Sequence, residues 1–346
     1  MKHTYKYNKH FSLESRSSFS ELKFTYHTYG NLNAAKNNVV WVIHALTANS
    51  DVFDWWKGLF GENEVFNPKD YFIVCANNLG SCYGTTGPLS ITKETGDPLF
   101  GNFPEITIKD MANSFDLLKD HLGIERIHTL IGGSQGGQIA LEWVLMNKTL
   151  TENMILIATN AKHSPWGIAF NESQRMAIKA DFSYFDNSKD AGKKGLAAAR
   201  SIALLSYRGY STYLSTQEDV EIDKINNYAA ASYQRYQGEK LVNRFNPYSY
   251  VCLLNAMDSH NISRGKNESM EQILNQITSK TLIISISSDI LFPSIEQKFL
   301  ANYISNAEYL VIDSAYGHDG FLIETKKISN AIINFYSKQS LTQIQK

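Results

Sequence analysis

Short, continuous apolar runs alternate with longer stretches of helical spacing along much of the chain. Such runs are expected to form strands, and the continuous β-branched run at residues 39–43 is expected to be buried on both faces of a sheet. These predicted strands are residues 39–43, 71–75, 129–131, 153–158, 281–285 and 309–312. Helical spacing is clearest at residues 107–122, 294–304 and 321–336. Strands that alternate with helices predict a mostly parallel central sheet with helices on both faces.

The N-terminal segment has a different pattern. Residues 11–17 and 21–29 favour β-structure on either side of Ser18-Phe19-Ser20, and we expect them to form an opening hairpin. Residues 1–10 are polar and lack the apolar core of a signal peptide. No uncharged run approaches the roughly 18 residues that are needed to cross a bilayer. We therefore expect a cytoplasmic protein with no membrane partner.

The pattern changes again after the fourth predicted core strand. The stretch is rich in Tyr, Arg, Lys and Gln and has no convincing buried strand. Apolar residues such as Ile168, Met176 and Leu204 provide helix faces, which favours packed helices over a linker. We predict a helical lid inserted into an α/β core, with the first part of the core at residues 1–163, the lid at 164–279 and the second part of the core at 280–346.

Composition narrows the classes of partner. The 346 residues include 43% hydrophobic and 19% charged residues, which is an ordinary globular balance. A net charge of −1 gives no reason to expect a nucleic acid partner. Cys75, Cys82 and Cys252 are odd in number and lack C-x-x-C spacing, so we expect neither a disulfide framework nor a metal site.

The candidate chemistry begins at residues 132–136, Gly-Gly-Ser-Gln-Gly, which fit the G-x-S-x-G nucleophile elbow between a strand and a helix. A serine on such a sharp turn is held in strained backbone geometry, so its neighbours must be small. The turn exposes the Ser134 hydroxyl and aims the backbone amide of Gln135 at a developing oxyanion. For the motif alone, a glycine-rich turn that binds phosphate, or no ligand, is the alternative.

Two later residues stand where a nucleophilic serine needs its partners. In the α/β-hydrolase order the acid follows the serine and the histidine comes last. Asp289 follows the next-to-last predicted strand and His318 follows the last, so both lie at carboxyl ends of strands. We predict Ser134 as nucleophile, His318 as base and Asp289 as orienting acid. Asp313 and Asp319 are alternative acids, and a helix N-cap is the alternative role of Asp289.

A second oxyanion donor is expected in the loop after an early central strand. Residues 44–48, His-Ala-Leu-Thr-Ala, occupy that place, and the Leu46 amide is the candidate partner of the Gln135 amide. The alternative is an ordinary strand-to-helix loop. His44, His163 and His260 are expected to be structural or to line the substrate site.

Further motifs are spread over nearly the whole chain, and both their residues and their order along it are informative. They are His44-Ala45-Leu46-Thr47, residues 78–88, residues 103–111, Ala169-Phe170-Asn171 with Arg175, Ala199-Arg200, Tyr207-Arg208, residues 236–241, Arg244-Phe245-Asn246, residues 288–293 and residues 316–324. Together with the elbow, this series resembles the homoserine O-acetyltransferase family of the α/β-hydrolase superfamily.

The resemblance implies an α/β-hydrolase fold and a ping-pong acyl transfer. Ser134 would take an acetyl group from acetyl-CoA as co-substrate, with no bound cofactor, and pass it to the hydroxyl of L-homoserine for methionine biosynthesis. His318 would act as base and then as acid in each half-reaction. The resemblance also implies a homodimer, because family members often pair through their lid helices.

The family holds the carboxylate and the ammonium of the amino acid with a lid arginine and with the aspartate after the catalytic histidine. These match Arg208 and Asp319, and the chemistry suits them, since Arg binds carboxylates bidentately. The alternatives are a lid salt bridge for Arg208 and a helix N-cap for Asp319.

The sequence departs from the family at several places. Gln135 stands where Met is usual, and its polar side chain in an acyl pocket would alter acyl choice or admit water. Ala48 and residues 49–53 also differ. Residues 209–213 replace an acidic continuation, which leaves Tyr210 and Tyr213 as candidates for the substrate-contacting tyrosine. A serine esterase of small acyl esters is therefore an alternative, as is an acyltransferase that uses serine as acceptor or succinyl-CoA as donor.

Overall fold

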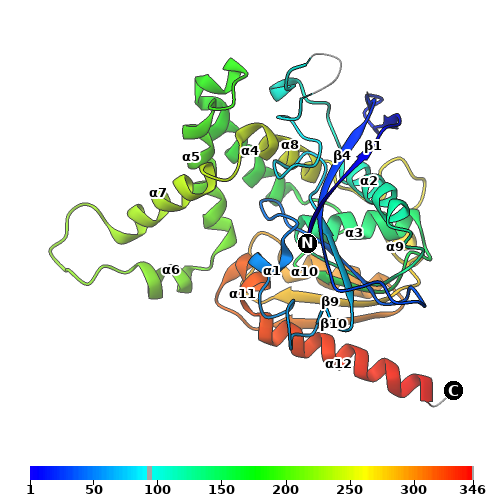
Figure 1. Cartoon of the computed structure of the whole chain (residues 1–346). Coiled ribbons are helices and arrows are strands. Elements are labelled where there is room, and N and C mark those ends of the chain that lie inside the picture. The colour runs from blue at the N-terminus through cyan, green and yellow to red at the C-terminus, as the bar shows by residue number, and fades with distance from the viewer. Residues whose placement is uncertain (92–95, 345–346) are drawn as a thin grey trace.

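A single mixed sheet forms the centre of the molecule (Figure 1). The computed structural model describes residues 1–91 and 96–344. Its sheet has 8 strands in the order β1-β4-β6-β5-β7-β8-β9-β10. The strands from β6 to β10 are parallel, while β1 and β4 are antiparallel at one edge. The bounds are β1 (Lys2–Tyr7), β4 (Leu22–Tyr29), β5 (Val39–Ile43), β6 (Phe72–Ala76), β7 (Ile127–Gly133), β8 (Thr151–Ile157), β9 (Lys280–Ile286) and β10 (Ala307–Ile312). The predicted core strands are thus confirmed.

The predicted opening hairpin is wrong. The strand β4 pairs with β1 and not with the run before it, while β2 (Phe11–Ser12) and β3 (Ser18–Phe19) form a short pair of their own. The signal in residues 2–7 is an alternation in which every second side chain is partly buried. The ring centre of one of these, Tyr5, lies 5.9 Å from that of Phe24. An edge strand contacts the core through one face only. The lysines on the other face of β1 therefore make its alternation hard to recognise in the sequence.

The strand β5 shows why its sequence is apolar throughout. Trp41 packs on one face of the sheet, with its ring centre 5.0 Å from that of Trp143 in the helix α3 (Gln135–Met146). Val40 and Val42 belong to a second buried cluster on the other face, which includes Ile332 of α12. Every side chain of β5 is fully buried, as expected for a central strand covered on both faces.

Helices cover both faces of the sheet (Figure 1). The predicted closing helix at 321–336 is two helices, because the chain breaks at Glu324 before it continues to Ile344. The bounds are α1 (Val52–Trp55), α2 (Ile108–His121), α3 (Gln135–Met146), α10 (Ser294–Tyr303), α11 (Gly320–Ile323) and α12 (Thr325–Ile344), with 3-10 turns η1 (Phe100–Asn102) and η3 (Gly317–Asp319). In the described ranges no helix is both long and apolar enough to cross a membrane.

Between β8 and β9 the chain is helical, as its pattern predicts. The elements are α4 (Pro165–Ala180), η2 (Phe182–Asp186), α5 (Lys193–Tyr207), α6 (Tyr210–Gln217), α7 (Ala229–Val242), α8 (Pro247–Asp258) and α9 (Met270–Leu274). Helix α5 packs against both α4 and α7. The helices α6 and α7 and the turn between them project from the body, and we call residues 210–242 the arm (Figure 1).

Candidate active site

Ser134 stands at the tip of a strained turn between β7 and α3. Its backbone has φ 55° and ψ −126°, a region that residues with a side chain rarely adopt. Hydrogen bonds hold this conformation: the Ser134 amide donates to the Ile157 carbonyl (2.9 Å), and the Ser134 carbonyl accepts from Thr159 Oγ1 (2.8 Å). The neighbouring strand β8 thus supports the turn.

Glycines are required around Ser134 because other parts of the backbone approach them closely. A Cβ atom at Gly132 would lie 2.4 Å from the backbone of Gly136. A Cβ atom at Gly136 would lie 2.2 Å from the Ile43 carbonyl oxygen, at the end of β5. No side chain fits at either position, which is the physical reason for the G-x-S-x-G pattern at this turn.

His318 and Asp289 meet at the carboxyl ends of the strands. Nδ1 of His318 lies 2.7 Å from Oδ2 of Asp289, whose side chain is completely buried. The other oxygen, Oδ1, accepts from the amides of Leu291 and Phe292, each at 2.9 Å. Because a carboxylate can only accept, the proton lies on Nδ1 of His318, and Nε2 carries the lone pair.

The other candidate acids lie elsewhere. Asp313 accepts from Ser287 Oγ at 3.0 Å, and Asp319 pairs with Arg208 at 3.1 Å. Asp289 alone among the three contacts the imidazole of His318 in the described structure. Its bonds to two amides cap a turn, but no helix begins there, because the next helix, α10, has Pro293 at its N-cap; the helix N-cap alternative for Asp289 is therefore wrong.

Ser134 and His318 line one pocket of about 240 Å³. No hydrogen bond joins the two side chains among the described residues, as is common before substrate tightens a site. Ser134 is 5% exposed, and the His318 ring stacks on Phe292 with 5.1 Å between ring centres. The other residues of the pocket are Ala45, Leu46, Thr47, Ala48, Asn49, Asp54, Trp55, Arg200, Tyr207, Arg244, Asp319, Phe321 and Leu322.

The two backbone amides expected from the sequence as oxyanion donors belong to Leu46 and Gln135. Gln135 is the first residue of α3, and Leu46 lies in the loop after β5 and lines the pocket. Within the described ranges neither amide donates to another protein group. Both amides are therefore available to donate a hydrogen bond to a ligand.

His44 is a buried, neutral residue that fixes this loop. Burial lowers its pKa to about 4. Its Nε2 accepts from the Asn78 amide at 2.9 Å, so its Nδ1–H donates to the Ala45 carbonyl at 2.8 Å. His44 thus has a structural role beside the pocket, as expected.

The Gln135 side chain does not enter the pocket, which overturns the expectation of a polar group in the acyl site. Its Oε1 accepts from the Asn78 side chain at 3.3 Å, and its Nε2 donates to the Leu253 carbonyl of α8 at 3.2 Å. The side chain is fully buried. Gln135 therefore ties the elbow to α8, because both halves of its amide find partners behind the turn.

Arg208 and Asp319 come together, as a salt bridge and not as separate groups. Nε of Arg208 donates to Oδ2 of Asp319, and the guanidinium lies 5.2 Å from the ring centre of Tyr233. Asp319 stands at the start of α11 but makes no side-chain cap bond there. The salt-bridge alternative for Arg208 thus describes the geometry, and the N-cap alternative for Asp319 does not.

Neither tyrosine considered from the sequence lines the pocket. Tyr210 is 80% exposed on the arm, and Tyr213 packs on Tyr233. The pocket instead contains Tyr207, whose ring centre lies 5.8 Å from that of His318. Tyr207 is the last residue of α5, and helical spacing alone gives no reason to prefer it over its neighbours.

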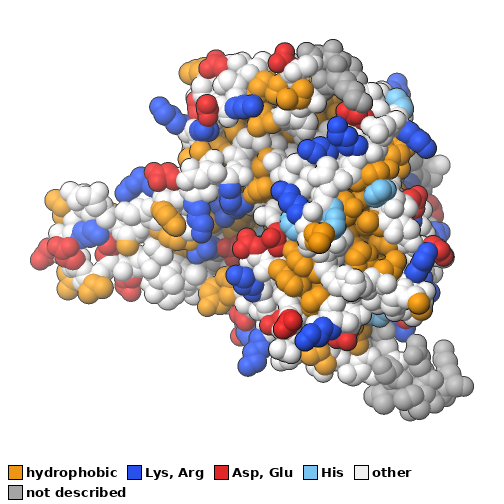
Figure 2. Space-filling view, in the orientation of Figure 1, with side chains coloured by type: hydrophobic (Ala, Val, Ile, Leu, Met, Phe, Trp, Pro, Cys, Tyr) orange, Lys and Arg blue, Asp and Glu red, His pale blue; other side chains and the backbone are white. Residues whose placement is uncertain are grey.

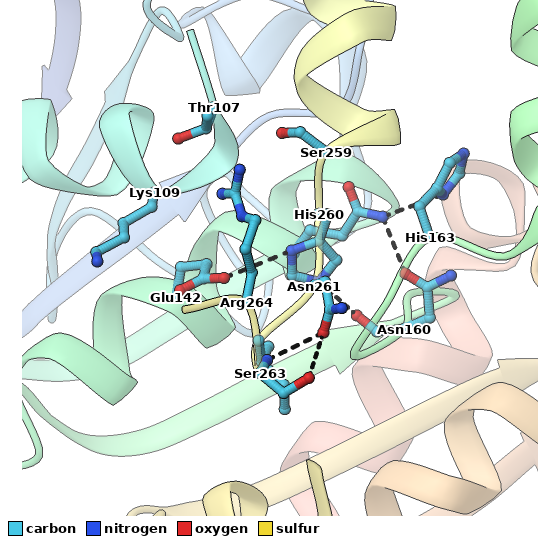
Figure 3. Close-up of polar contacts among 12 residues, drawn as sticks. Thr107, Lys109, Glu142, Asn160, His163, Ser259, His260, Asn261, Ser263 and Arg264 are labelled. Atoms are coloured by element: carbon cyan, nitrogen blue, oxygen red, sulfur yellow. Dashed lines mark hydrogen bonds and ion pairs between the residues drawn. The ribbon is translucent and has the colours of Figure 1, made fainter. Parts of the chain in front are cut away.

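His163 and His260 belong to a buried polar network with Glu142 and Asn160 (Figure 3). Nε2 of His260 donates to the Asn160 carbonyl at 3.0 Å, and Nδ1 faces Glu142 at 3.8 Å. Burial lowers the pKa of His260 to about 3 and that of His163 to about 4. Neither lines the pocket of Ser134, so both are structural.

No metal-binding cluster is present in the part of the chain that the structure describes. The pocket is lined by a serine hydroxyl, an imidazole and charged groups of both signs. This set is suited to acyl transfer through a covalent intermediate.

Comparisons with known proteins agree with this geometry. Residues 38–325 match the protein family described as alpha/beta hydrolase fold. The homoserine O-acetyltransferase of Cyclobacterium marinum is 48% identical over 325 residues, which cover 94% of this chain and 92% of that protein. That of Chlorobaculum parvum is 43% identical over 328 residues, with coverage of 94% and 92%.

Solved structures show the same fold. Homoserine O-acetyltransferase from Bacillus anthracis matches with a TM-score of 0.86 at 24% identity, covering 95% of this chain and 96% of that one. Esterase E22 matches with a TM-score of 0.88 at 22% identity, with coverage of 97% and 99%. The fold is therefore shared by proteins named for acetyl transfer and for ester hydrolysis.

Proposed function

The chain belongs to the homoserine O-acetyltransferase family of α/β-hydrolase proteins, and we propose that it moves an acetyl group from acetyl-CoA to L-homoserine through an acetyl-enzyme on Ser134. The observation that carries the proposal is the Asp289–His318 pair, whose imidazole lines the same pocket as a strained elbow serine. The name of the relatives that are 43% and 48% identical, homoserine O-acetyltransferase, supports homoserine as the acceptor and acetyl as the group transferred.

In the first half-reaction Nε2 of His318 takes the hydroxyl proton of Ser134 while the serine oxygen attacks the thioester carbonyl. The amides of Leu46 and Gln135 donate to the oxyanion of the tetrahedral intermediate. The carbon–sulfur bond then breaks, and the proton on His318 goes to the CoA sulfur. Asp289 holds the imidazole and stabilises its charged form.

In the second half-reaction the hydroxyl of L-homoserine replaces the thiol. His318 takes the hydroxyl proton while the oxygen attacks the acetyl carbonyl, and the same amides receive the oxyanion. The bond to Ser134 then breaks, and His318 returns a proton to the serine oxygen. The product is O-acetyl-L-homoserine, a precursor in methionine biosynthesis. Arg208 and Asp319 define the acceptor end of the site.

The helices between β8 and β9 act as a lid in this proposal. Ser134 is 5% exposed, and α5 contributes Arg200 and Tyr207 to its pocket. Transfer competes with hydrolysis, so a covered pocket favours an alcohol acceptor over bulk water during the life of the acetyl-enzyme.

We also propose a homodimer that forms through the arm. Val220, Ile222 and Ile225 are between 86% and 97% exposed in the turn between α6 and α7. Hydrophobic side chains gather at the far end of the arm (Figure 2). Such clustered exposed apolar groups are typical of interaction surfaces. Light scattering should show a dimer that Ile222→Asp dissociates, whereas Ile295→Asp on α10 should not dissociate it.

We place the reaction in the cytoplasm. Acetyl-CoA is an intracellular donor, and Cys75, Cys82 and Cys252 are all free thiols, as is usual in a reducing compartment. Cell fractionation of a tagged chain would test this placement.

The transferase reaction is tested by CoA release from acetyl-CoA with and without L-homoserine, with the product identified by mass. We expect release that depends on the amino acid and yields O-acetylhomoserine. Release that is indifferent to L-homoserine and yields free acetate would show an esterase-like thioester hydrolase instead.

A further inference from the structure

Two buried residues that follow β8 support the nucleophile turn from one side. Oγ1 of Thr159 donates to the Ser134 carbonyl at 2.8 Å. Oδ1 of Asn160 accepts from Nε2 of Gln138, near the start of α3, at 2.9 Å. The Asn160 carbonyl also accepts from Nε2 of His260 at 3.0 Å (Figure 3). Residues 159–160 are thus bonded both to the elbow serine and to the helix that follows it.

The same two residues are bonded to α10. Nε2 of Gln297 donates to the Thr159 carbonyl at 2.6 Å, and Nδ2 of Asn160 donates to Oε2 of Glu296 at 2.9 Å. Oε1 of Gln297 accepts in turn from Oγ of Ser285 in β9, at 3.0 Å. Buried polar groups that lose such partners cost free energy, so α10 and residues 159–160 are expected to move together.

Helix α10 follows directly on the loop that carries the orienting acid. We call residues 287–293 the acid loop. Asp289 lies in it and holds the imidazole of His318, and the loop ends at Pro293, the N-cap of α10. Glu296 stands in the first turn of that helix. The bond between Asn160 and Glu296 therefore connects the elbow with the start of the helix that anchors the acid loop.

We propose that Glu296 is a positioning residue for the catalytic pair: it holds the acid loop in register with the elbow through Asn160, and its negative charge favours the protonated imidazole that forms on His318. Glu296 does not line the pocket of Ser134, so it touches no substrate and acts through Asn160 and Asp289. The inference rests on the proposed acetyl transfer and adds to it a residue from outside the pocket.

The surroundings of Glu296 place its ionisation near neutral pH. Burial raises its pKa to about 6, and hydrogen bonds from Asn160 and Ser164 oppose that rise. Two charged groups face it among the described residues. The charge of Asp289 also raises the pKa, and Lys162 lines the same surface hollow of about 220 Å³. The other residues of this hollow are uncharged: Asn160, Ala161, Met270, Ile295 and Phe299.

The charge of Glu296 bears on the step in which His318 takes the proton of Ser134. Above about pH 6 Glu296 is a carboxylate, and its charge adds to that of Asp289 in stabilising the imidazolium. Below that pH it is neutral and this effect is lost. The hydrogen bond from Asn160 can persist, because a protonated carboxyl group keeps an acceptor oxygen. The charge and the bridge can therefore be tested separately.

The test removes the charge in one variant and the bridge in another. Glu296→Gln keeps an acceptor for Asn160 without the charge, while Asn160→Ala removes the bridge. The rate constant of acetyl-enzyme formation is taken from the burst of CoA release between about pH 5 and pH 8. At the upper end we expect Glu296→Gln to be about 3- to 10-fold slower than the wild type. Asn160→Ala should be about 10- to 100-fold slower, because the elbow and the acid loop lose their register.

The pH dependence separates an electrostatic role from mere support. The ratio of the wild-type rate constant to that of Glu296→Gln should fall toward 1 as the pH is lowered, with a midpoint at about pH 6. Glu308→Gln is the matched control, since Glu308 pairs with Lys338 near the amino end of β10, away from the site. Thermal melts show which variants stay folded, and the ratio for Glu296→Gln decides even where Asn160→Ala does not fold.

A ratio that stays the same at every pH, or a Glu296→Gln protein as fast as the wild type throughout, would overturn the proposal. A folded Asn160→Ala protein with the wild-type rate would overturn it as well. A wild-type protein that forms no acetyl-enzyme from acetyl-CoA would instead refute the proposed function.

Discussion

At the scale of single residues, His318 uses its two ring nitrogens for separate tasks. Nδ1 donates to Asp289, and this bond sets the tautomer that leaves Nε2 free to accept a proton, as the proposed base role requires. Phe292 and Phe321 pack around the ring and limit its orientation. The reactivity proposed for Ser134 therefore depends on a carboxylate that never touches the substrate.

Asp289→Asn tests this dependence. The amide is nearly isosteric, but it favours the wrong tautomer of His318, so we expect kcat to fall by about three to four orders of magnitude while the protein stays folded. Steady-state kinetics and a thermal melt measure the two quantities. Asp313→Asn is the matched control, since Asp313 bonds to Ser287 and lies outside the pocket. Equal losses in both variants would argue against Asp289 as the orienting acid.

Gln135→Met separates the side chain of the elbow residue from its backbone amide. The substitution leaves the Leu253 carbonyl and one donor of Asn78 without their partner, which should cost about 1–3 kcal/mol of the free energy of unfolding. Acetyl transfer should change only a few-fold, because the proposed oxyanion donor is the backbone amide N–H, which the substitution keeps. Urea unfolding and kcat/KM check these outcomes. A large change in acyl selectivity with unchanged stability would indicate that the Gln135 side chain does enter the pocket.

At the scale of elements, the sequence predicts most of the central sheet. Strands such as β5 are buried on both faces, so their apolar runs are unbroken and easy to recognise. The elbow was predictable as well, because its glycines are needed wherever two backbones approach this closely.

Other features depend on contacts between residues that are far apart in the sequence, and the local pattern does not reveal these contacts. The strand β1 contacts the core on one face only, and its lysines hide the alternation. Arg200 and Tyr207 are two among many polar residues of a long helical stretch, and only the packing of α5 over Ser134 selects them. The destination of the Gln135 side chain is set by Asn78 and Leu253, which are distant in sequence.

Gly136→Ala tests the packing of the elbow against β5. Its Cβ would meet the Ile43 carbonyl at 2.2 Å, so the turn must shift and we expect a loss of about 1–3 kcal/mol or more in stability, together with loss of acetyl-enzyme formation. Differential scanning calorimetry and intact-protein mass measure these effects. Gly101→Ala is the control, because a Cβ there meets nothing closer than 3.8 Å. A stable, active Gly136→Ala protein would contradict the described elbow.

At the scale of the whole molecule, buried neutral histidines couple folding to pH. The folded protein lowers the pKa of His260 from 6.5 to about 3. Between these values the unfolded chain binds a proton that the folded protein excludes, so stability falls as the pH drops below about 6.5. Glu142 acts in the opposite sense, because burial raises its pKa and the folded protein binds its proton more tightly.

His260→Gln isolates the contribution of the histidine. Glutamine can still donate to the Asn160 carbonyl but does not titrate. Below pH 6.5 we expect the decline in the free energy of unfolding to become shallower by at most about 1.4 kcal/mol per pH unit. Chemical denaturation at a series of pH values gives the slope. A slope that matches the wild type would show that His260 is not held neutral in the folded protein.

The central claim joins Ser134, the lid and the acceptor end in one covalent cycle. The most direct measurement is peptide mass spectrometry of the protein after mixing with acetyl-CoA alone and then with L-homoserine. We predict one acetyl group on Ser134, absent in Ser134→Ala, that disappears when L-homoserine is added and returns as O-acetylhomoserine. An acetyl group that never forms on Ser134, or one that leaves only as acetate whether or not L-homoserine is present, would contradict the account.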